Sequence, residues 1–341
     1  MTNAKTHNQA LHCFMCSNKI SSAPLSYNDI GWTTNEQFLS LKIYFCSFCT
    51  FAFAFPELNP EDIHSYYAEQ YRSPKSTFYI NFNKKVIPEI NDLYNNRSFA
   101  QLTLARSFCT FDHGDSFLDI GPGKGGSFII ANAIFPAPAL HAIELSKEAD
   151  EYYKKNFNTT SHLSLTNFSK GERKAKIILM SHSLEHFCMS DLDILFKNIQ
   201  TALHDEGVLV IEVPNVNMQV HQYVRGPDTP HLLFFTPKSL KALLIKYKFK
   251  VLFIDTCGPL YNLKKHESSV HPALLKKIFN NMPHRIQIYS RTIVRFFRLV
   301  WKYIQKPLEL ISRNSTSTTL PNHSYGGERK ALRLIAKVDH E

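Results

Sequence analysis

Residues 117–128 (FLDIGPGKGGSF) place four glycines and one acid between two apolar runs. The pattern predicts a strand, a turn too tight for side chains, and the start of a helix. At Gly121, Gly123 and Gly125 the missing side chains let the backbone approach a ligand closely, and the N–H groups that open the helix attract an anionic group. We therefore expect a cofactor to bind at this turn.

Two acids indicate which cofactor this is. Glu144 ends the next apolar run, 23 residues after Gly121, where a carboxylate suits the two hydroxyls of a ribose. The glycine pattern alone also fits nicotinamide enzymes. Asp119 favours a different cofactor, because an acid two residues before the first glycine would repel a pyrophosphate. The same acid would attract the cationic amine of S-adenosylmethionine, which has no phosphate.

Four of the seven cysteines form two Cys-x-x-Cys pairs, Cys13 with Cys16 and Cys46 with Cys49, separated by 29 residues. This spacing can arrange four thiolates tetrahedrally around one Zn²⁺. Four thiolates leave no open coordination position, so the zinc would be structural. The alternatives are chance pairs or disulfides in an exported protein. No apolar signal segment opens the chain, so we expect a reducing, cytoplasmic location and favour zinc.

Three later segments carry a family resemblance. They are residues 177–187 (IILMSHSLEHF), 206–215 (EGVLVIEVPN) and 231–240 (HLLFFTPKSL). With the glycine turn, they resemble the fourth strand, the fifth strand and the segment before the next helix of class I S-adenosylmethionine-dependent methyltransferases. A Leu-Glu-His triplet is common after the fourth strand of that family. The resemblance covers about residues 100–260 and implies that the chain transfers a methyl group.

The resemblance also implies a set of residues that hold S-adenosylmethionine. We expect these to be Asp119, Gly121, Gly123, Gly125, Glu144, Asn167 and Ser181. One of them departs from the family pattern, which usually places an acid near the adenine amino group. Here Asn167 lies in that region, and its amide oxygen can accept one hydrogen bond without the assistance of a charge.

The reaction itself requires an aligned acceptor and a base. Methyl transfer from a sulfonium is an in-line displacement, so the protein must hold the acceptor atom and the methyl carbon together in a dry pocket. A hydroxyl acceptor must also lose a proton, and histidine suits a pH near neutrality. His231 and His182 are the first candidates for this base. His186 is the third, because it also suits a role in anchoring its turn. Tyr71 and Asn215 are candidates for orienting the acceptor.

Strands alternate with helices along most of the chain, which predicts a parallel sheet covered on both faces. One helix starts near Ser190 with a capping-box-like pattern. Its apolar stripe consists of Leu192, Leu195, Ile199 and Leu203. Thr236 and Pro237 open another helix. The expected fold class is α/β, with a doubly wound, Rossmann-like, seven-stranded methyltransferase sheet whose last strand, by the resemblance, is antiparallel.

Aromatic residues connect the cysteine pairs to this core. Phe51, Phe53 and Phe55 predict a strand that packs a zinc ribbon onto the main domain, and a helix bearing Tyr67 and Tyr71 follows. This order resembles a bacterial group that methylates modified and surface sugars, in which the tyrosine segment can overhang the active site; simple interdomain packing is the alternative. The expected domains are a zinc ribbon (1–58), an aromatic helical linker or lid (59–99), the core (100–260), a basic helical insertion and loop (261–327), and the final core strand (328–341).

The positive charge is concentrated in the insertion. The chain has a net charge of +10, and residues 261–313 hold eleven Lys and Arg against two Glu. Residues 285–306 predict a basic amphipathic helix containing Trp301, which suits peripheral contact with a membrane or an acidic partner. Packing on its own protein is the alternative. No apolar run approaches the length of a membrane span.

Three functions compete. The leading one is O-methylation of a small molecule or glycan in surface-polysaccharide biosynthesis. C-methylating members of the sugar group carry a large additional carboxy-terminal domain, for which this chain ends too soon. The second function is RNA methylation through the ribbon and basic segment. We do not expect nucleic acid as a partner, because Lys19 and Lys42 are the only basic residues between Cys13 and Cys49, and phosphate binding needs several. The third is a non-catalytic scaffold, which the intact glycine turn and Glu144 disfavour.

Overall fold

The computed structural model describes residues 11–26, 38, 40–71, 93–170, 173–216, 231–260, 324–327 and 329–340. The chain divides into two compact units, Met1–Tyr261 with Pro321–Glu341 and Asn262–Leu320, and all described residues belong to the first. The basic segment, including the membrane contact expected through residues 285–306, lies outside the described residues. No helix among the described residues is long and apolar enough to cross a bilayer.

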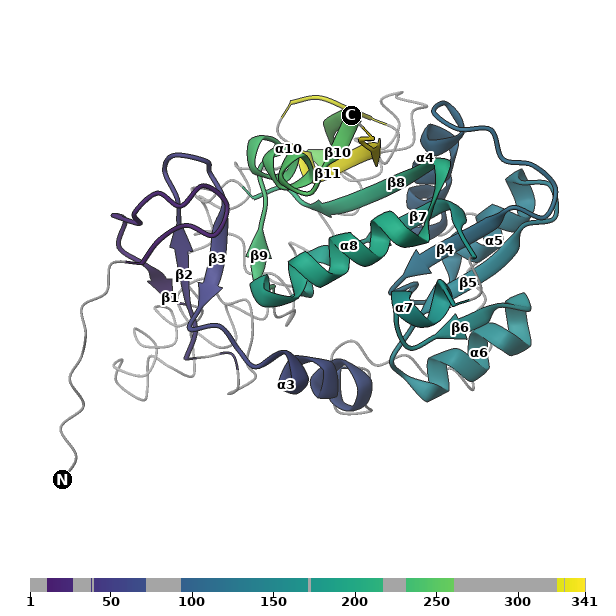
Figure 1. Cartoon of the computed structure of the whole chain (residues 1–341), viewed down its shortest axis with the longest axis horizontal. Coiled ribbons are helices and arrows are strands. Elements are labelled where there is room, and N and C mark those ends of the chain that lie inside the picture. Colours follow the sequence, from purple (N-terminus) through teal and green to yellow (C-terminus); the bar gives the residue numbers. More distant parts are fainter. Residues whose placement is uncertain are drawn as a thin grey trace, which may run out of the picture. The chain divides into compact units, whose positions relative to one another are not determined.

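A seven-stranded sheet forms the centre of the described structure, in the order β10-β11-β8-β7-β4-β5-β6 (Figure 1). Its strands are β4 (Ser116–Ile120), β5 (Ala139–Ile143), β6 (Thr160–His162), β7 (Ala175–Ser181), β8 (Leu203–Pro214), β10 (Phe249–Leu260) and β11 (Arg329–Val338). Strands β4 to β8 pair in parallel, whereas β11 is antiparallel to both β8 and β10. The predicted fold class is confirmed, including its antiparallel last strand.

Helices cover both faces of this sheet. They are α4 (Leu93–Arg106), α5 (Gly126–Ile134), α6 (Lys147–Phe157), α7 (Leu165–Phe168), α8 (Leu192–Ala202) and α10 (Pro237–Lys246). Successive strand residues point to opposite faces, so the core falls into two clusters. In β7, Ile177 packs with residues of α4, α5 and α6, whereas Ile178 packs with residues of α7, α8 and α10. The sheet is therefore doubly wound.

The two predicted helix starts have different outcomes. Thr236 caps α10 as expected: its Oγ1 accepts from the Ser239 amide at 3.2 Å, and the Ser239 hydroxyl accepts from the Thr236 amide at 2.9 Å. The capping-box start near Ser190 is wrong. Helix α8 instead follows directly from a 3₁₀ turn, η3 (Met189–Asp191), and the Asp191 side chain makes no capping bond. Leu192, Leu195 and Ile199 of its apolar stripe are buried as expected, whereas Leu203, predicted on the same helix, is the first residue of β8.

A second, four-stranded sheet has the order β1-β2-β3-β9. Its strands are β1 (Leu25–Ser26), β2 (Lys42–Phe45), β3 (Ala52–Phe55) and β9 (Leu233–Phe234). Three strands come from the cysteine module, and β9 comes from the segment before α10. Phe51 and Phe53 are buried, and the Phe51 ring lies 5.5 Å from that of Phe235, whereas Phe55 is 36% exposed. The cysteine module and the core therefore share one sheet.

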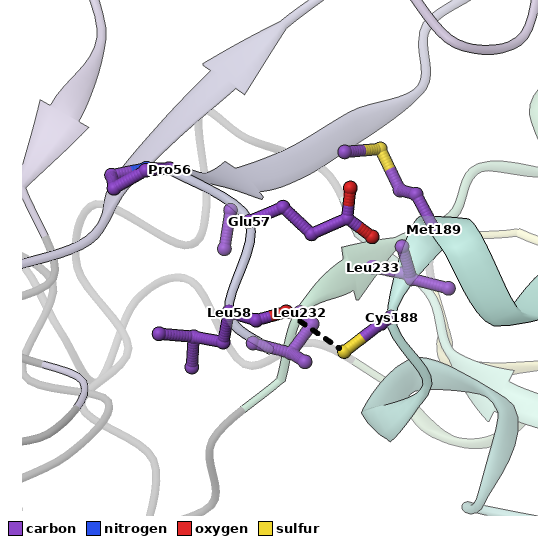
Figure 2. A pocket seen from close by; sticks show the side chains of 8 residues that line it. Pro56, Glu57, Leu58, Cys188, Met189, Leu232 and Leu233 are labelled. Carbon is purple, nitrogen blue, oxygen red and sulfur yellow. Dashed lines mark hydrogen bonds between the residues drawn. The ribbon is translucent and has the colours of Figure 1, made fainter. Parts of the chain in front are cut away.

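After β3 the chain contacts the segment that follows β7, and it then forms the helix that bears Tyr66, Tyr67 and Tyr71. The amide of Ser190 donates to the Glu57 carboxylate at 2.7 Å, and the Cys188 thiol donates to the Leu58 carbonyl at 3.6 Å. Figure 2 shows a small, mostly apolar cavity at this junction, with Leu232 and Leu233 of the β9 segment on its wall. The helix consists of α3 (Pro60–Ser65) and a π-helical turn, η1 (Tyr66–Gln70).

Candidate functional site

The glycine turn joins β4 to α5 with a backbone that other residues rarely adopt. Gly121, Gly123 and Gly125 have φ angles of +79°, +61° and +74°. Gly125 is also the N-cap of α5, and a Cβ there would lie 2.5 Å from the Phe157 ring. The Gly121 amide donates to the Ile143 carbonyl at 3.1 Å, which brings the turn beside the end of β5. The turn has the left-handed backbone that favours glycine.

Asp119 is buried beneath this turn, with 2% of its surface exposed. Its Oδ2 accepts a hydrogen bond from the Ser127 hydroxyl in the first turn of α5. Its Oδ1 has no hydrogen-bond partner among the described residues. Burial raises the pKa of Asp119 to about 7, and the Glu144 charge adds to this rise, while the Ser127 hydrogen bond opposes it. A buried oxygen without a donor is rare, and a cationic amine would satisfy it.

Glu144 follows β5 and reaches the glycine turn through a tyrosine. Its Oε1 accepts from the amides of Leu145 and Ser146 at 2.9 and 3.0 Å. The Tyr153 hydroxyl of α6 lies 2.6 Å from the Gly123 carbonyl oxygen and 3.2 Å from Glu144 Oε2. Sequence reasoning missed Tyr153, although its place on the buried face of an amphipathic helix was visible. Gly123 and Glu144 are thus brought together as expected.

The other two expected cofactor residues have local partners. Ser181 ends β7, and its hydroxyl accepts from the Gln101 amide of α4 at 2.8 Å. Asn167 lies in α7 and is exposed, and its side-chain oxygen accepts from the Ser164 hydroxyl at 2.5 Å. Their roles toward the cofactor stay predictions.

His182 follows β7 with a left-handed φ of +54° and lies between two carboxylates. Its Nδ1 is 3.3 Å from Glu185 Oε1, and its Nε2 is 3.6 Å from Glu212 Oε1. Burial and the Arg97 guanidinium oppose protonation, but the two carboxylates outweigh them and raise the pKa of His182. His182 therefore holds a proton more firmly than an ordinary histidine does.

The other two predicted histidines meet at the same glutamate. His231 Nε2 lies 3.9 Å from Glu185 Oε1, and the rings of His186 and His231 are 4.9 Å apart. Tyr67 reaches this group, with its hydroxyl 2.7 Å from His186 Nδ1. The structure thus brings all three predicted histidines together around Glu185. That residue entered the sequence prediction only as part of a family triplet.

His182 contacts a buried ionic network around Glu212, which was not predicted from the sequence. Glu212 Oε2 accepts from Arg333 Nε at 2.8 Å and from Gln101 at 2.9 Å, and Arg97 Nε lies 3.3 Å from Oε1. Arg333 has no exposed surface. Burial opposes ionisation, but Arg333 and His182 lower the pKa of Glu212 well below its usual range. An arginine within the apolar run of residues 331–336 was the available signal.

Tyr71 and Asn215, the two candidates for orienting the acceptor, lie in different surroundings. The Tyr71 ring is 4.9 Å from the Tyr67 ring and 6.4 Å from that of His186. The Asn215 amide donates to the Arg329 carbonyl at 2.8 Å and so connects the end of β8 to β11. Tyr71 thus packs with Tyr67 and His186, whereas the Asn215 side chain makes a hydrogen bond between two strands of the sheet.

The four cysteines of the amino-terminal module converge on one point. The sulfurs of Cys13 and Cys49 are 3.5 Å apart, and those of Cys16 and Cys46 are 3.6 Å apart. All four lie within 4.8 Å of one another. Sulfurs at about 2.3 Å from a tetrahedral Zn²⁺ are about 3.8 Å apart, so the four thiols fit one ion.

Residues 93–253 match a family model described as a methyltransferase domain. This part of the chain is a methyltransferase domain. The matched range contains the whole glycine turn, Glu144 and the histidine group around Glu185. The amino-terminal cysteine module lies before it. No curated protein sequence matches the chain.

Several solved methyltransferase structures resemble this chain. Coclaurine N-methyltransferase bound to N-methylheliamine and S-adenosylhomocysteine is 16% identical, with 70% of each chain covered and a TM-score of 0.38. A methyltransferase from Archaeoglobus fulgidus is 18% identical, with 71% of this chain and 94% of that chain covered and a TM-score of 0.42. The plantazolicin methyltransferase BpumL with S-adenosylhomocysteine is 15% identical, with 82% and 94% covered and a TM-score of 0.44.

Proposed function

We propose that this enzyme methylates a hydroxyl oxygen of a small-molecule or glycan acceptor, in surface-polysaccharide biosynthesis. The observation that carries the chemistry is the pairing of two sites at the carboxyl edge of one sheet. Asp119 lies in β4 and the glycine turn follows that strand. His182, Glu185 and His186 follow the neighbouring β7, and His231 joins them from the segment before β9. Ligands of doubly wound sheets bind at this edge, so a cofactor and an acceptor can meet there.

The residues at the glycine turn fit S-adenosylmethionine. Asp119 Oδ1 offers an acceptor to the cofactor's amine, and Glu144 offers a carboxylate to its ribose. The left-handed glycines keep side chains away from the space that the cofactor needs. When bound, the cofactor supplies a methyl group on a sulfonium, whose S–C bond breaks as the new O–C bond forms. Asp119 would repel the pyrophosphate of a nicotinamide cofactor.

The group around Glu185 suits the acceptor, whose hydroxyl must lose a proton during transfer. His182 is held between two carboxylates and is the least suited of the three histidines to take up a further proton. We therefore assign proton removal to the Glu185–His186–His231 cluster, with His182 supplying positive charge nearby. Tyr67, bonded to His186, and Tyr71 beside it form an aromatic wall that suits the apolar face of a sugar ring.

The same proposal includes one structural Zn²⁺ on Cys13, Cys16, Cys46 and Cys49. The close approach of the four sulfurs supports it, as does the absence of an open position for catalysis in a four-thiolate site. Metal analysis of freshly purified protein should give one zinc per chain. Its loss in a Cys46→Ser variant would assign the ion to this cluster, and a metal-free wild-type protein would contradict the proposal.

The cofactor assignment is tested by calorimetry with S-adenosylhomocysteine. Asp119→Ala should weaken binding at least tenfold, because the buried acceptor for the amine is lost. Asp112→Ala is the matched control, since Asp112 is exposed and lies in the segment just before β4. Equal affinities of the two variants would contradict the role of Asp119. Failure of the wild-type protein to bind would contradict the proposed function itself.

The acceptor is tested by turnover against nucleotide sugars, lipid-linked glycans and structured RNA. We expect methylation of a sugar hydroxyl and no methylation of RNA. Tight, steeply salt-dependent RNA binding with methyl incorporation would favour the RNA methyltransferase alternative instead. A protein that binds the cofactor but methylates no member of a broad panel would favour the scaffold.

A further inference from the structure

A second group of possible metal ligands lies at the carboxyl edge of the sheet, apart from the four cysteines. One ligand atom from each of Glu185, His186 and His231 lies within 4.8 Å of the others. Two imidazoles and one carboxylate suit first-row divalent ions such as Mn²⁺, Fe²⁺, Co²⁺ and Zn²⁺. Three protein ligands also leave coordination positions open for water or for an oxygen of a substrate.

The Glu185 carboxylate is the strongest sign of a site for a cation in addition to His182. It is 1% exposed, and neither of its oxygens has a hydrogen bond among the described residues. Burying an ionised carboxylate without such bonds is costly. The nearest nitrogens are His182 Nδ1 at 3.3 Å and His231 Nε2 at 3.9 Å. Two ligands that each lie about 2.1 Å from one ion are about 3.0–3.4 Å apart at octahedral or tetrahedral angles, so the His231 contact would shorten by about half an ångström when an ion binds.

The ligands are held in place by groups behind them. The Tyr67 oxygen lies 2.7 Å from His186 Nδ1, and an imidazole that donates from Nδ1 has its lone pair on Nε2, where a metal binds. The Leu232 amide donates to the Glu185 carbonyl at 2.8 Å, which holds the His231 segment against the Glu185 turn. Orientation of metal-binding histidines by a partner on the second nitrogen is the usual arrangement in metal sites.

We propose that Glu185, His186 and His231 bind one divalent transition-metal ion, which coordinates the acceptor oxygen. The inference rests on the proposed function and specifies how its cluster removes the proton. Coordination makes the acceptor hydroxyl more acidic, and the proton leaves to water. An oxygen lone pair then forms the O–CH₃ bond, and the electrons of the S–CH₃ bond remain on sulfur. The ion is neither oxidised nor reduced.

Titration with Mn²⁺, followed by the electron paramagnetic resonance signal of the free ion, tests this directly. Mn²⁺ prefers oxygen and nitrogen ligands to thiolates, so a zinc-loaded cysteine cluster does not compete for it. The wild-type protein should take up one Mn²⁺ per chain. Glu185→Gln and His231→Asn should each bind Mn²⁺ at least tenfold more weakly. His64→Gln should leave the affinity unchanged, because His64 is an exposed residue of α3.

Binding of S-adenosylhomocysteine by each variant shows that it is folded, since these residues lie outside the glycine turn. Absence of Mn²⁺ uptake by the wild-type protein would overturn the metal proposal, as would equal uptake by Glu185→Gln and His231→Asn. Undiminished turnover in the presence of a chelator, with zinc retained in the cysteine cluster, would also overturn it while leaving the methyltransferase function intact. Loss of cofactor binding by the wild-type protein would contradict the proposed function instead.

Discussion

Two buried carboxylates, Asp119 in β4 and Glu212 in β8, have opposite electrostatic surroundings. Asp119 has one hydroxyl donor and the nearby charge of Glu144, and its burial raises its pKa to about 7. Glu212 has two arginines and a histidine around it, and its pKa is lowered. The first is therefore ready to receive a cation, whereas the second already has its countercharges. This difference supports the proposed binding role of Asp119 and a structural role for Glu212.

The raised pKa of Asp119 predicts how cofactor affinity depends on pH. Only the ionised acid attracts an amine, so affinity for S-adenosylhomocysteine should fall as pH decreases below about 7, by up to tenfold per unit. Calorimetry between pH 6 and 8 measures this slope. Asp119→Asn should bind more weakly and without the slope. The same slope in Asp119→Asn would assign the titration to another group.

The raised pKa also affects the stability of the free protein. The folded state binds the Asp119 proton more tightly than the unfolded state, so this group stabilises the fold fully below its ordinary pKa of 3.8. That contribution is lost as pH rises through about 7. Asp119→Asn lacks this ionisable group. The unfolding free energy of the variant relative to that of the wild type should therefore increase as pH rises from about 4 to about 7.

A side chain at Gly125 should destabilise the fold by more than backbone strain alone, because it would also clash with the Phe157 ring. Gly125→Ala should lower the unfolding free energy by about 2 kcal/mol or more, because a left-handed alanine costs about 1 kcal/mol and its Cβ meets the Phe157 ring. That ring packs against Phe128 and Tyr152 and has little room to move. Gly114→Ala is the control, with φ +82° and no atom near its Cβ. Urea unfolding should show the larger loss for Gly125→Ala.

At the scale of elements, the last strand does more than complete the sheet. β11 lies between β8 and β10 and inserts Arg333 against Glu212, which in turn contacts His182. Helix α4 adds Arg97 and Gln101 to the same carboxylate. A helix and two strands that are far apart in the sequence thus determine the position of His182.

This network predicts a large cost for removing one partner. Arg333→Met should lower the unfolding free energy by about 3–5 kcal/mol, because it leaves the Glu212 carboxylate buried without its principal countercharge. Lys330→Met is the matched control on the same strand, since Lys330 is exposed. Thermal unfolding of both variants gives the comparison. Similar stabilities would mean that Arg97 and Gln101 suffice to hold Glu212.

At the scale of the molecule, features that depend on local sequence could be predicted, whereas contacts between residues far apart in the chain could not. The glycine turn and the cysteine pairs depend on neighbours within a few residues, and both were visible in the sequence. Arg333 and Glu212 are 121 residues apart, and only the sheet order brings them together. The addition of β9 to the cysteine module likewise depends on tertiary register. Charged pairs and shared strands of this kind leave no short sequence pattern.

The shared sheet predicts that the cysteine module influences the proposed acceptor site but not the glycine turn. Cys49→Ser should disrupt the cluster, loosen β3 and β9, and so displace His231, which precedes β9. Turnover should fall at least tenfold, while S-adenosylhomocysteine affinity stays within about twofold. Cys109→Ser is the control, because Cys109 lies outside the cluster. Undiminished turnover of Cys49→Ser would show that the module is independent of the acceptor site.

The pairing of β3 with β9 also has a consequence for the order in which the protein is made. Phe53 pairs with Leu233, so the partner of β3 leaves the ribosome about 180 residues after β3 itself. Until then, the edge of β3 and the apolar face of Phe51 and Phe53 lack their cover. Unpaired strand edges and exposed apolar surface favour aggregation during synthesis. The cysteine module, although translated before the core, is therefore among the last parts to reach its final packing.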